Sequence, residues 1–118
     1  MEREDLLKIL TGDINLINSV NINDVALPED EVVVMPFHVK KMLHEYLSGR
    51  ISSEDLTRWA FFITMRAEYC CINYLDFEIA DYYEDMFYVI QRLSTPQLDG
   101  EVNEARVKSY LSELTKYF

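Results

Sequence analysis

Apolar side chains recur at the three- and four-residue spacing of an α-helix along most of this chain. The first such segment opens with acidic residues, carries Leu6, Leu7 and Leu10, and reaches a glycine at position 12. Acidic residues stabilise the amino end of a helix, and glycine commonly follows its last turn. A short helix that ends at about Gly12 is therefore predicted.

Two helices are predicted in the middle of the chain. Pro36 suits a first helical position and Gly49 a carboxyl-terminal cap. The apolar stripe between them consists of Val39, Met42, Leu43, Tyr46 and Leu47. Ser52 and Asp55 have the spacing of a capping box, and the helix that they begin is apolar on nearly all sides, so it should be the central one. Its inward face is expected to hold Leu56, Trp59, Ala60, Ile63, Ala67, Cys70 and Cys71.

Two more helices are predicted in the last third. From Asp76 onward, a helical period places Ile79, Tyr83, Met86, Ile90 and Leu93 on one side. Pro96 then stops the chain, Gly100 turns it, and Asn103 can cap a last helix. The inward side of that helix is expected to hold Val107, Tyr110, Leu111, Leu114 and Phe118.

The fold class that follows is all-α, a single-domain bundle of about five helices over residues 1–118. The stretch 13–35 leaves helix and strand open, because its apolar residues fit either period. Residues 28–31 read as an exposed acidic turn, and residues 32–35 as a short extended or buried piece. Any small β element is expected in 13–35. Trp59 is expected to be a core residue whose indole N–H finds an acceptor.

Charge changes the picture of what the protein can bind. The chain has 21 acidic and 11 basic residues and a formal net charge of −10. Such a field repels nucleic acids and anionic membranes, so a basic protein partner is favoured. The sequence has no long apolar span and opens with charged residues after Met1. A cytoplasmic location is therefore expected.

The chain carries little that suggests catalysis. His38 and His44 lack the spacing of zinc ligands, and the three glycines are isolated, so no phosphate-binding loop is present. The adjacent Cys70 and Cys71 are expected to be buried free thiols, because a disulfide between neighbours is strained. We expect no metal, no cofactor and no enzymatic activity.

One stretch stands out by charge. Between Arg66 and Arg92 there are six acidic residues and no Lys or Arg, and tyrosines are interleaved with them. Ordinary surface helices mix charges of both signs, so an acidic stripe with tyrosines indicates a docking face for a basic partner, although it can also be only a solvated face. The candidate partner-binding residues are Glu68, Asp76, Glu78, Asp81, Tyr82, Glu84, Asp85 and Tyr88.

Two segments carry a resemblance to a known family. LSGRISSEDLTRWA (47–60) and LSTPQLDGEVNEARVKSYLSEL (93–114), with the acidic middle between them, resemble small bacterial immunity proteins of contact-dependent growth inhibition and related polymorphic toxin systems. The resemblance spans roughly residues 36–118. It implies a cytoplasmic, non-catalytic inhibitor that binds one cognate toxin C-terminal domain, often a nuclease with a basic cleft. The alternative is a helical adaptor or regulatory subunit that uses the same face for another basic protein.

Overall fold

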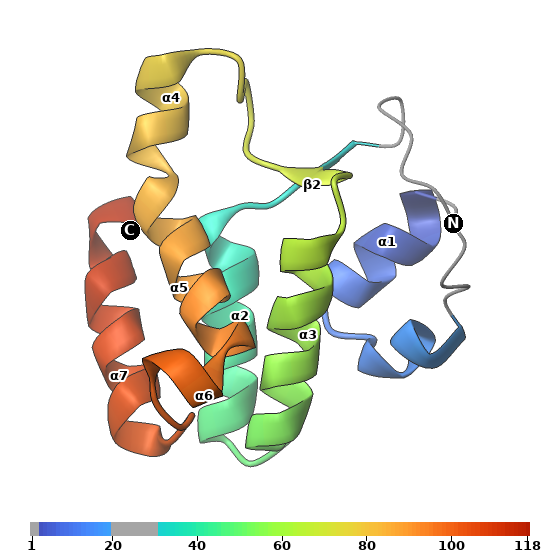
Figure 1. Ribbon diagram of the computed structural model, residues 1–118, viewed down its shortest axis with the longest axis vertical. Coiled ribbons are helices and arrows are strands. Elements are labelled where there is room, and N and C mark those ends of the chain that lie inside the picture. Colours follow the sequence, from blue (N-terminus) through green and yellow to red (C-terminus); the bar gives the residue numbers. More distant parts are fainter. Residues whose placement is uncertain (1–2, 20–30) are drawn as a thin grey trace.

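The computed structural model describes residues 3–19 and 31–118, and these are mainly helical (Figure 1). The α-helices are α1 (Arg3–Leu10), α2 (Pro36–Leu47), α3 (Ser53–Met65), α4 (Phe77–Tyr82), α5 (Glu84–Ser94), α6 (Pro96–Asp99) and α7 (Glu104–Glu113). Two 3₁₀ helices, η1 (Ile14–Ser19) and η3 (Leu114–Tyr117), and two short strands, β1 (Val32–Val33) and β2 (Tyr69–Cys70), complete the described elements. The predicted all-α class is confirmed.

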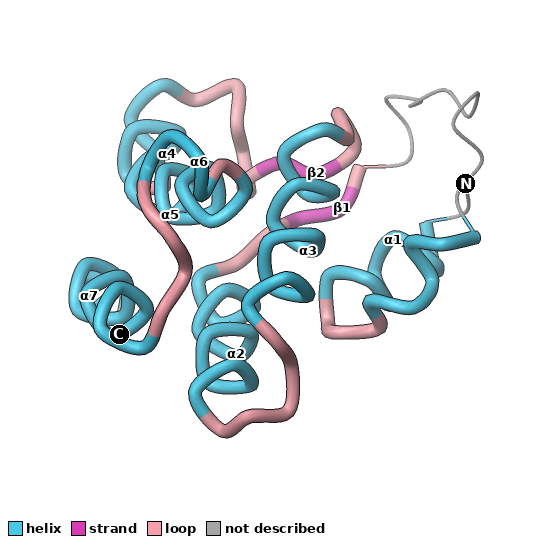
Figure 2. The backbone as a smooth tube through the Cα atoms, turned by 60° about the horizontal axis from the view of Figure 1, so that its bottom comes forward, coloured by secondary structure: helices cyan, strands magenta, loops and turns pink. Residues whose placement is uncertain are grey.

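Four helices form the body of the molecule. α2, α3, α5 and α7 run alongside one another, and Figure 2 looks nearly along their axes. α3 packs along α5, and α2 lies against α3, α5 and α7, while α1 and η1 cover α3 on its other side. α4 continues beyond the amino end of α5 and stands clear of these four helices (Figure 1).

The core is centred on α3, as predicted. Trp59 is fully buried, and its indole N–H donates to the carbonyl oxygens of Ile9 at 3.1 Å and Leu10 at 3.3 Å. Most residues expected on the inward faces are buried. The exceptions besides Phe118 are half-buried or, for Ala67, exposed: Tyr46, Leu47, Ala67, Cys70, Ile79, Tyr83 and Leu111. Phe118 was expected inside, but 59% of it is exposed, because the chain leaves the helical path after η3.

Local capping signals account for several helix boundaries. The Asp55 N–H donates to Ser52 Oγ and the Ser52 N–H donates to Asp55 Oδ2, both at 3.1 Å, which is the predicted capping box. Asn103 Oδ1 accepts the Arg106 N–H at 2.9 Å and so begins α7. Gly49 has φ of +80°, a conformation that glycine adopts without the strain of a Cβ atom, and it follows α2 as expected.

The prediction that the central helix continues to Cys71 is wrong. α3 ends at Met65, Arg66 is extended, and β2 pairs in parallel with β1. The Val32 N–H donates to the Glu68 carbonyl oxygen at 2.8 Å, so a strand partner distant in sequence replaces helical hydrogen bonds. β1 confirms the β element expected within 13–35. Ile14–Ser19 is helical, and the predicted turn at 28–31 lies outside the described residues except for Glu31.

The acidic helix is also not continuous. Asp76 caps α4, α4 ends at Tyr82, and α5 begins at Glu84 after Tyr83, whose φ and ψ are −91° and 2°. The Tyr83 ring stacks on the Tyr117 ring with centroids 5.8 Å apart. The break therefore lies where the carboxyl-terminal turn packs against the junction of α4 and α5.

Within the described ranges, no helix has the length and apolar character needed to cross a bilayer.

Candidate functional site

The loop after β2 and the helix that follows it form a projecting arm, residues 72–82. Phe77 is 90% exposed and Leu75 is 81% exposed, and α4 buries none of its residues. The arm is nevertheless ordered at its turn, because Asp76 Oδ1 accepts the Glu78 N–H at 3.0 Å and the Ile79 N–H at 3.4 Å. Large apolar side chains that are exposed to solvent on an ordered turn and helix are typical of an interaction surface.

An open groove of about 760 Å³ lies beside the arm. Its apolar wall includes Phe77, Ala80 and Phe87, which lie three and seven residues apart and so share one side of α4 and α5 across the break. Cys70 and Cys71 line it from the strand side. The groove therefore joins the end of the small sheet to the two acidic helices.

Three carboxylates contribute to the same groove, and they come from three separate segments of the chain. Glu31 precedes β1, Asp81 lies on α4 and Glu84 begins α5. None of them forms an ion pair with a residue in the described part of the chain. The groove is therefore negatively charged without an internal cation to balance it.

Tyrosine hydroxyls orient two of these carboxylates. Tyr88 donates to Glu84 Oε1 at 2.9 Å, and Tyr74 donates to Glu31 Oε1 at 2.7 Å. Hydrogen bonding to the neighbouring carboxylate raises the pKa of both Tyr88 and Tyr74, so both remain protonated donors. Asp81 has no hydrogen bond or ion pair with any described residue, which leaves its oxygens available to a ligand.

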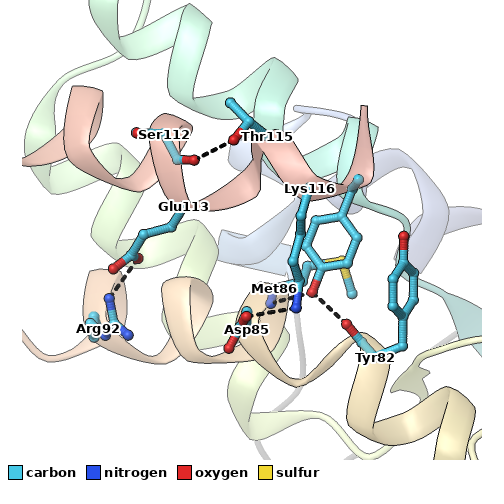
Figure 3. A network of polar contacts seen from close by, with 9 residues as sticks. Tyr82, Asp85, Met86, Arg92, Ser112, Glu113, Thr115 and Lys116 are labelled. Atoms are coloured by element: carbon cyan, nitrogen blue, oxygen red, sulfur yellow. Dashed lines mark hydrogen bonds and ion pairs between the residues drawn. The ribbon is translucent and has the colours of Figure 1, made fainter.

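The predicted acidic stripe does not form one face. Asp85 points away from the groove, and its carboxylate pairs with Lys116 Nζ at 2.7 Å (Figure 3). The same ammonium group lies 5.6 Å from the centroid of the Tyr82 ring. Arg92 pairs with Glu113 at 2.8 Å. Asp81 and Glu84 thus face the groove, whereas Tyr82 and Asp85 face the carboxyl-terminal turn.

The predicted exposed position of Glu68 is wrong. It is 2% exposed, and its carboxylate forms a two-point ion pair with the Arg66 guanidinium, with Nε to Oε1 at 3.0 Å. The prediction placed Glu68 on an exposed helical stripe, but the chain there is approaching β2, which turns this side chain inward. Glu68 cannot contact a partner without unfolding this region.

Two further predicted site residues lie on the arm. Asp76 serves first as a helix cap, and Glu78 is exposed and unpaired among the described residues.

Several residues of the groove were not predicted from the sequence. Phe77 and Phe87 read as ordinary apolar positions, and Glu31 lies far away in the chain. No local signal in the sequence marks these residues as a group, because tertiary structure brings them to one groove.

The groove offers sites for binding rather than an activated nucleophile. Burial raises the pKa of both the Cys70 and the Cys71 thiol, so both are protonated at neutral pH, and an un-ionised thiol is a poor nucleophile. In residues 3–19 and 31–118, no three His, Cys, Asp or Glu side chains are grouped in a way that could hold a metal ion.

Among the described residues, the groove and the arm are the features from which a binding function can be argued. Comparison of this chain with protein-family models, with curated proteins and with solved structures finds no match to any of them.

Proposed function

We propose that this protein is an immunity protein that binds and neutralises a cognate bacterial toxin domain, through the surface formed by the arm and the acidic groove. The observation that carries this proposal is the arm itself. Leu75 in the turn before α4 and Phe77 in α4, a helix that buries none of its residues, are presented to solvent beside carboxylates that no described cation balances.

The chemistry of this surface fits a basic protein. Opposite charge accelerates encounter and excludes wrong partners, while apolar and aromatic side chains supply the buried area that slows dissociation. Tyr74, Tyr82 and Tyr88 are each close to half exposed, so they can add contact area at small entropic cost. An acidic surface can also occupy the positions where a nuclease holds phosphates.

The toxin as partner comes from the resemblance of residues 47–60 and 93–114 to immunity proteins. These segments form the start of α3 and the region of α6 and α7, which lie away from the arm. An adaptor that binds another basic protein would use the same surface. The identity of the partner therefore decides between the two functions.

We expect the toxin domain to be encoded directly before this gene, so the experiment is to express the product of that neighbouring gene and to measure growth protection and binding with it. Asp81→Lys with Glu84→Lys reverses two groove charges, and we expect loss of binding and of protection. The matched control is Glu54→Lys with Glu101→Lys, which makes the same change in net charge at a separate hollow where α3 begins. Folding of both variants is checked by circular dichroism.

A single truncation measures the contact at its centre. Asp81→Ala is expected to weaken toxin binding by about 2–5 kcal/mol if this carboxylate is desolvated in the complex. If the folded double reversal at 81 and 84 protects cells as well as wild type does, the proposed surface is wrong. If wild type neither binds nor protects against that toxin, the immunity function is wrong and the adaptor alternative is favoured.

A further inference from the structure

We propose that the groove receives a segment of the basic partner that inserts one large apolar side chain flanked by Arg or Lys. This inference rests on the proposed function and specifies how the partner is recognised. The partner then enters the hollow between α4, α5 and β2, rather than only lying across the exposed arm.

The size and lining of the groove support insertion. Its volume of about 760 Å³ lies in the range of sites that enclose a ligand, and it exceeds what one side chain fills. Phe77, Ala80 and Phe87 provide an apolar wall, and Ala80 leaves space that a bulkier residue would occupy. An inserted apolar side chain would be removed from water on several sides at once.

The charges define what surrounds that apolar side chain. Glu31, Asp81 and Glu84 approach the groove from three separate segments, so a cation beside the inserted residue can meet a carboxylate on more than one side. The tyrosine hydroxyls occupy part of the acceptor capacity of Glu31 and Glu84 and leave the rest for N–H donors of the partner. Arginine suits such a position because its guanidinium group donates in several directions.

Charge also argues against a second copy of this chain as the occupant. The net charge is −10, and the only basic residues near the acidic segment in sequence, Arg66 and Arg92, are engaged with Glu68 and Glu113. Two copies meeting at this groove would bring like charges together. A separate basic protein is the occupant that these charges favour.

Filling the groove tests the proposal without changing charge. Ala80→Trp should weaken binding of the purified toxin domain by about 30-fold or more, the effect of losing one binding hot spot. Ala105→Trp, the same change at an exposed position of α7, should leave binding unchanged. Phe77→Ala removes part of the wall at a side chain that is 90% exposed, so it should weaken binding while leaving stability intact.

Cys70 gives a direct measure of occupancy. Its thiol is half-buried in the groove, whereas Cys71 is buried. In a Cys71→Ala background, the toxin domain should slow the reaction of Cys70 with a thiol reagent by about 10-fold or more, as expected when an interface excludes solvent. The reference is the rate at which Cys70 reacts in the same variant without the toxin domain.

The outcomes separate this inference from the proposed function. If charge reversal at 81 and 84 abolishes protection, while Ala80→Trp binds as wild type does and Cys70 stays reactive in the complex, the partner uses the rim alone and insertion is wrong. If the toxin domain does not bind wild type, the proposed function fails, and the groove is then tested with synthetic peptides.

The peptide probes are Arg-Arg-Trp-Arg-Arg and Arg-Arg-Gly-Arg-Arg, with blocked ends. The tryptophan peptide should shift the amide resonances of Ala80 and Phe87 in a two-dimensional NMR spectrum, and in Ala80→Trp the shift of the Phe87 resonance should be abolished. Shifts that are equal for the two peptides, or absent at the groove, would overturn the inference, because the apolar side chain would then contribute nothing.

Discussion

The hydroxyl of Tyr117 donates a hydrogen bond to the carbonyl oxygen of Tyr82 at 2.8 Å and accepts one from the Met86 N–H at 3.2 Å. A break between two helices leaves the last carbonyls of one and the first amides of the next without helical partners. One side chain from η3 serves both ends of this break. The carboxyl-terminal turn therefore sets where α4, and with it the arm, leaves α5 (Figure 3).

Tyr117→Phe should loosen this junction while keeping the stacked ring. The expected cost is about 1–3 kcal/mol of unfolding free energy, measured by urea denaturation, because the hydroxyl makes two hydrogen bonds and its loss leaves the buried Met86 N–H without an acceptor. Hydrogen exchange of the Met86 amide should accelerate more than that of amides in α3. Unchanged exchange at Met86 would show that the hydroxyl does not hold the break.

Tyr110→Phe is the matched control, with the opposite expectation. The Tyr110 ring is buried and its hydroxyl has no hydrogen-bond partner among the described residues. Because a buried polar group without a partner costs free energy, its removal should be neutral or stabilising.

Helix starts were predictable because their causes are local. The capping signals act within one helical turn, so the sequence alone is enough to place the helix starts. They are Pro36 for α2, Ser52 with Asp55 for α3, and Asn103 for α7. The end of α3 was not predictable in the same way. It depends on pairing of Tyr69–Cys70 with Val32–Val33, and nothing near Arg66 in the sequence indicates that partner.

The candidate site shows the same division between local and distant causes. A run of acids with no base is visible in the sequence, but the compensation of Asp85 by Lys116 is a tertiary contact. Asp81 and Glu84 face a groove to which Glu31, distant in the chain, also contributes. The sequence could predict that this segment is acidic, but not which of its carboxylates face the groove.

Removing Arg66 and removing Glu68 from their ion pair should cost different amounts of unfolding free energy. The Glu68 side chain is 1% exposed and the Arg66 side chain is 12% exposed. Arg66→Met leaves a buried carboxylate without its cation and should cost about 3–5 kcal/mol in unfolding free energy. Glu68→Met should cost less, because the guanidinium that remains is closer to solvent.

The double variant Arg66→Met, Glu68→Met completes this test. Replacing both charges by apolar side chains of similar size removes the desolvation penalty together with the attraction, so stability should recover relative to Arg66→Met alone. The measurement is urea denaturation of the three variants at pH 7. A double variant as unstable as the sum of the two single variants would show that the pair is not coupled.

His38 makes stability depend on pH near neutrality. It is buried at the start of α2, and its Nδ1 accepts the Met35 N–H at 2.9 Å, which requires an unprotonated nitrogen. Burial, with a smaller contribution from the positive charge of Lys41, lowers the pKa of His38 below its ordinary value of 6.5. The unfolded chain therefore binds a proton before the folded protein does. This contribution to stability is complete above pH 6.5 and is lost as the pH falls from there toward the folded-state pKa.

In His38→Asn the amide oxygen can take the place of Nδ1 as an acceptor and does not titrate, so the urea midpoint should become less sensitive to pH below 6.5. His44→Asn, at an exposed position of the same helix, should keep the pH dependence of wild type. If the two variants show the same pH dependence between about pH 5 and 7, a range chosen above the ordinary carboxylate pKa values, His38 is not the source of the effect.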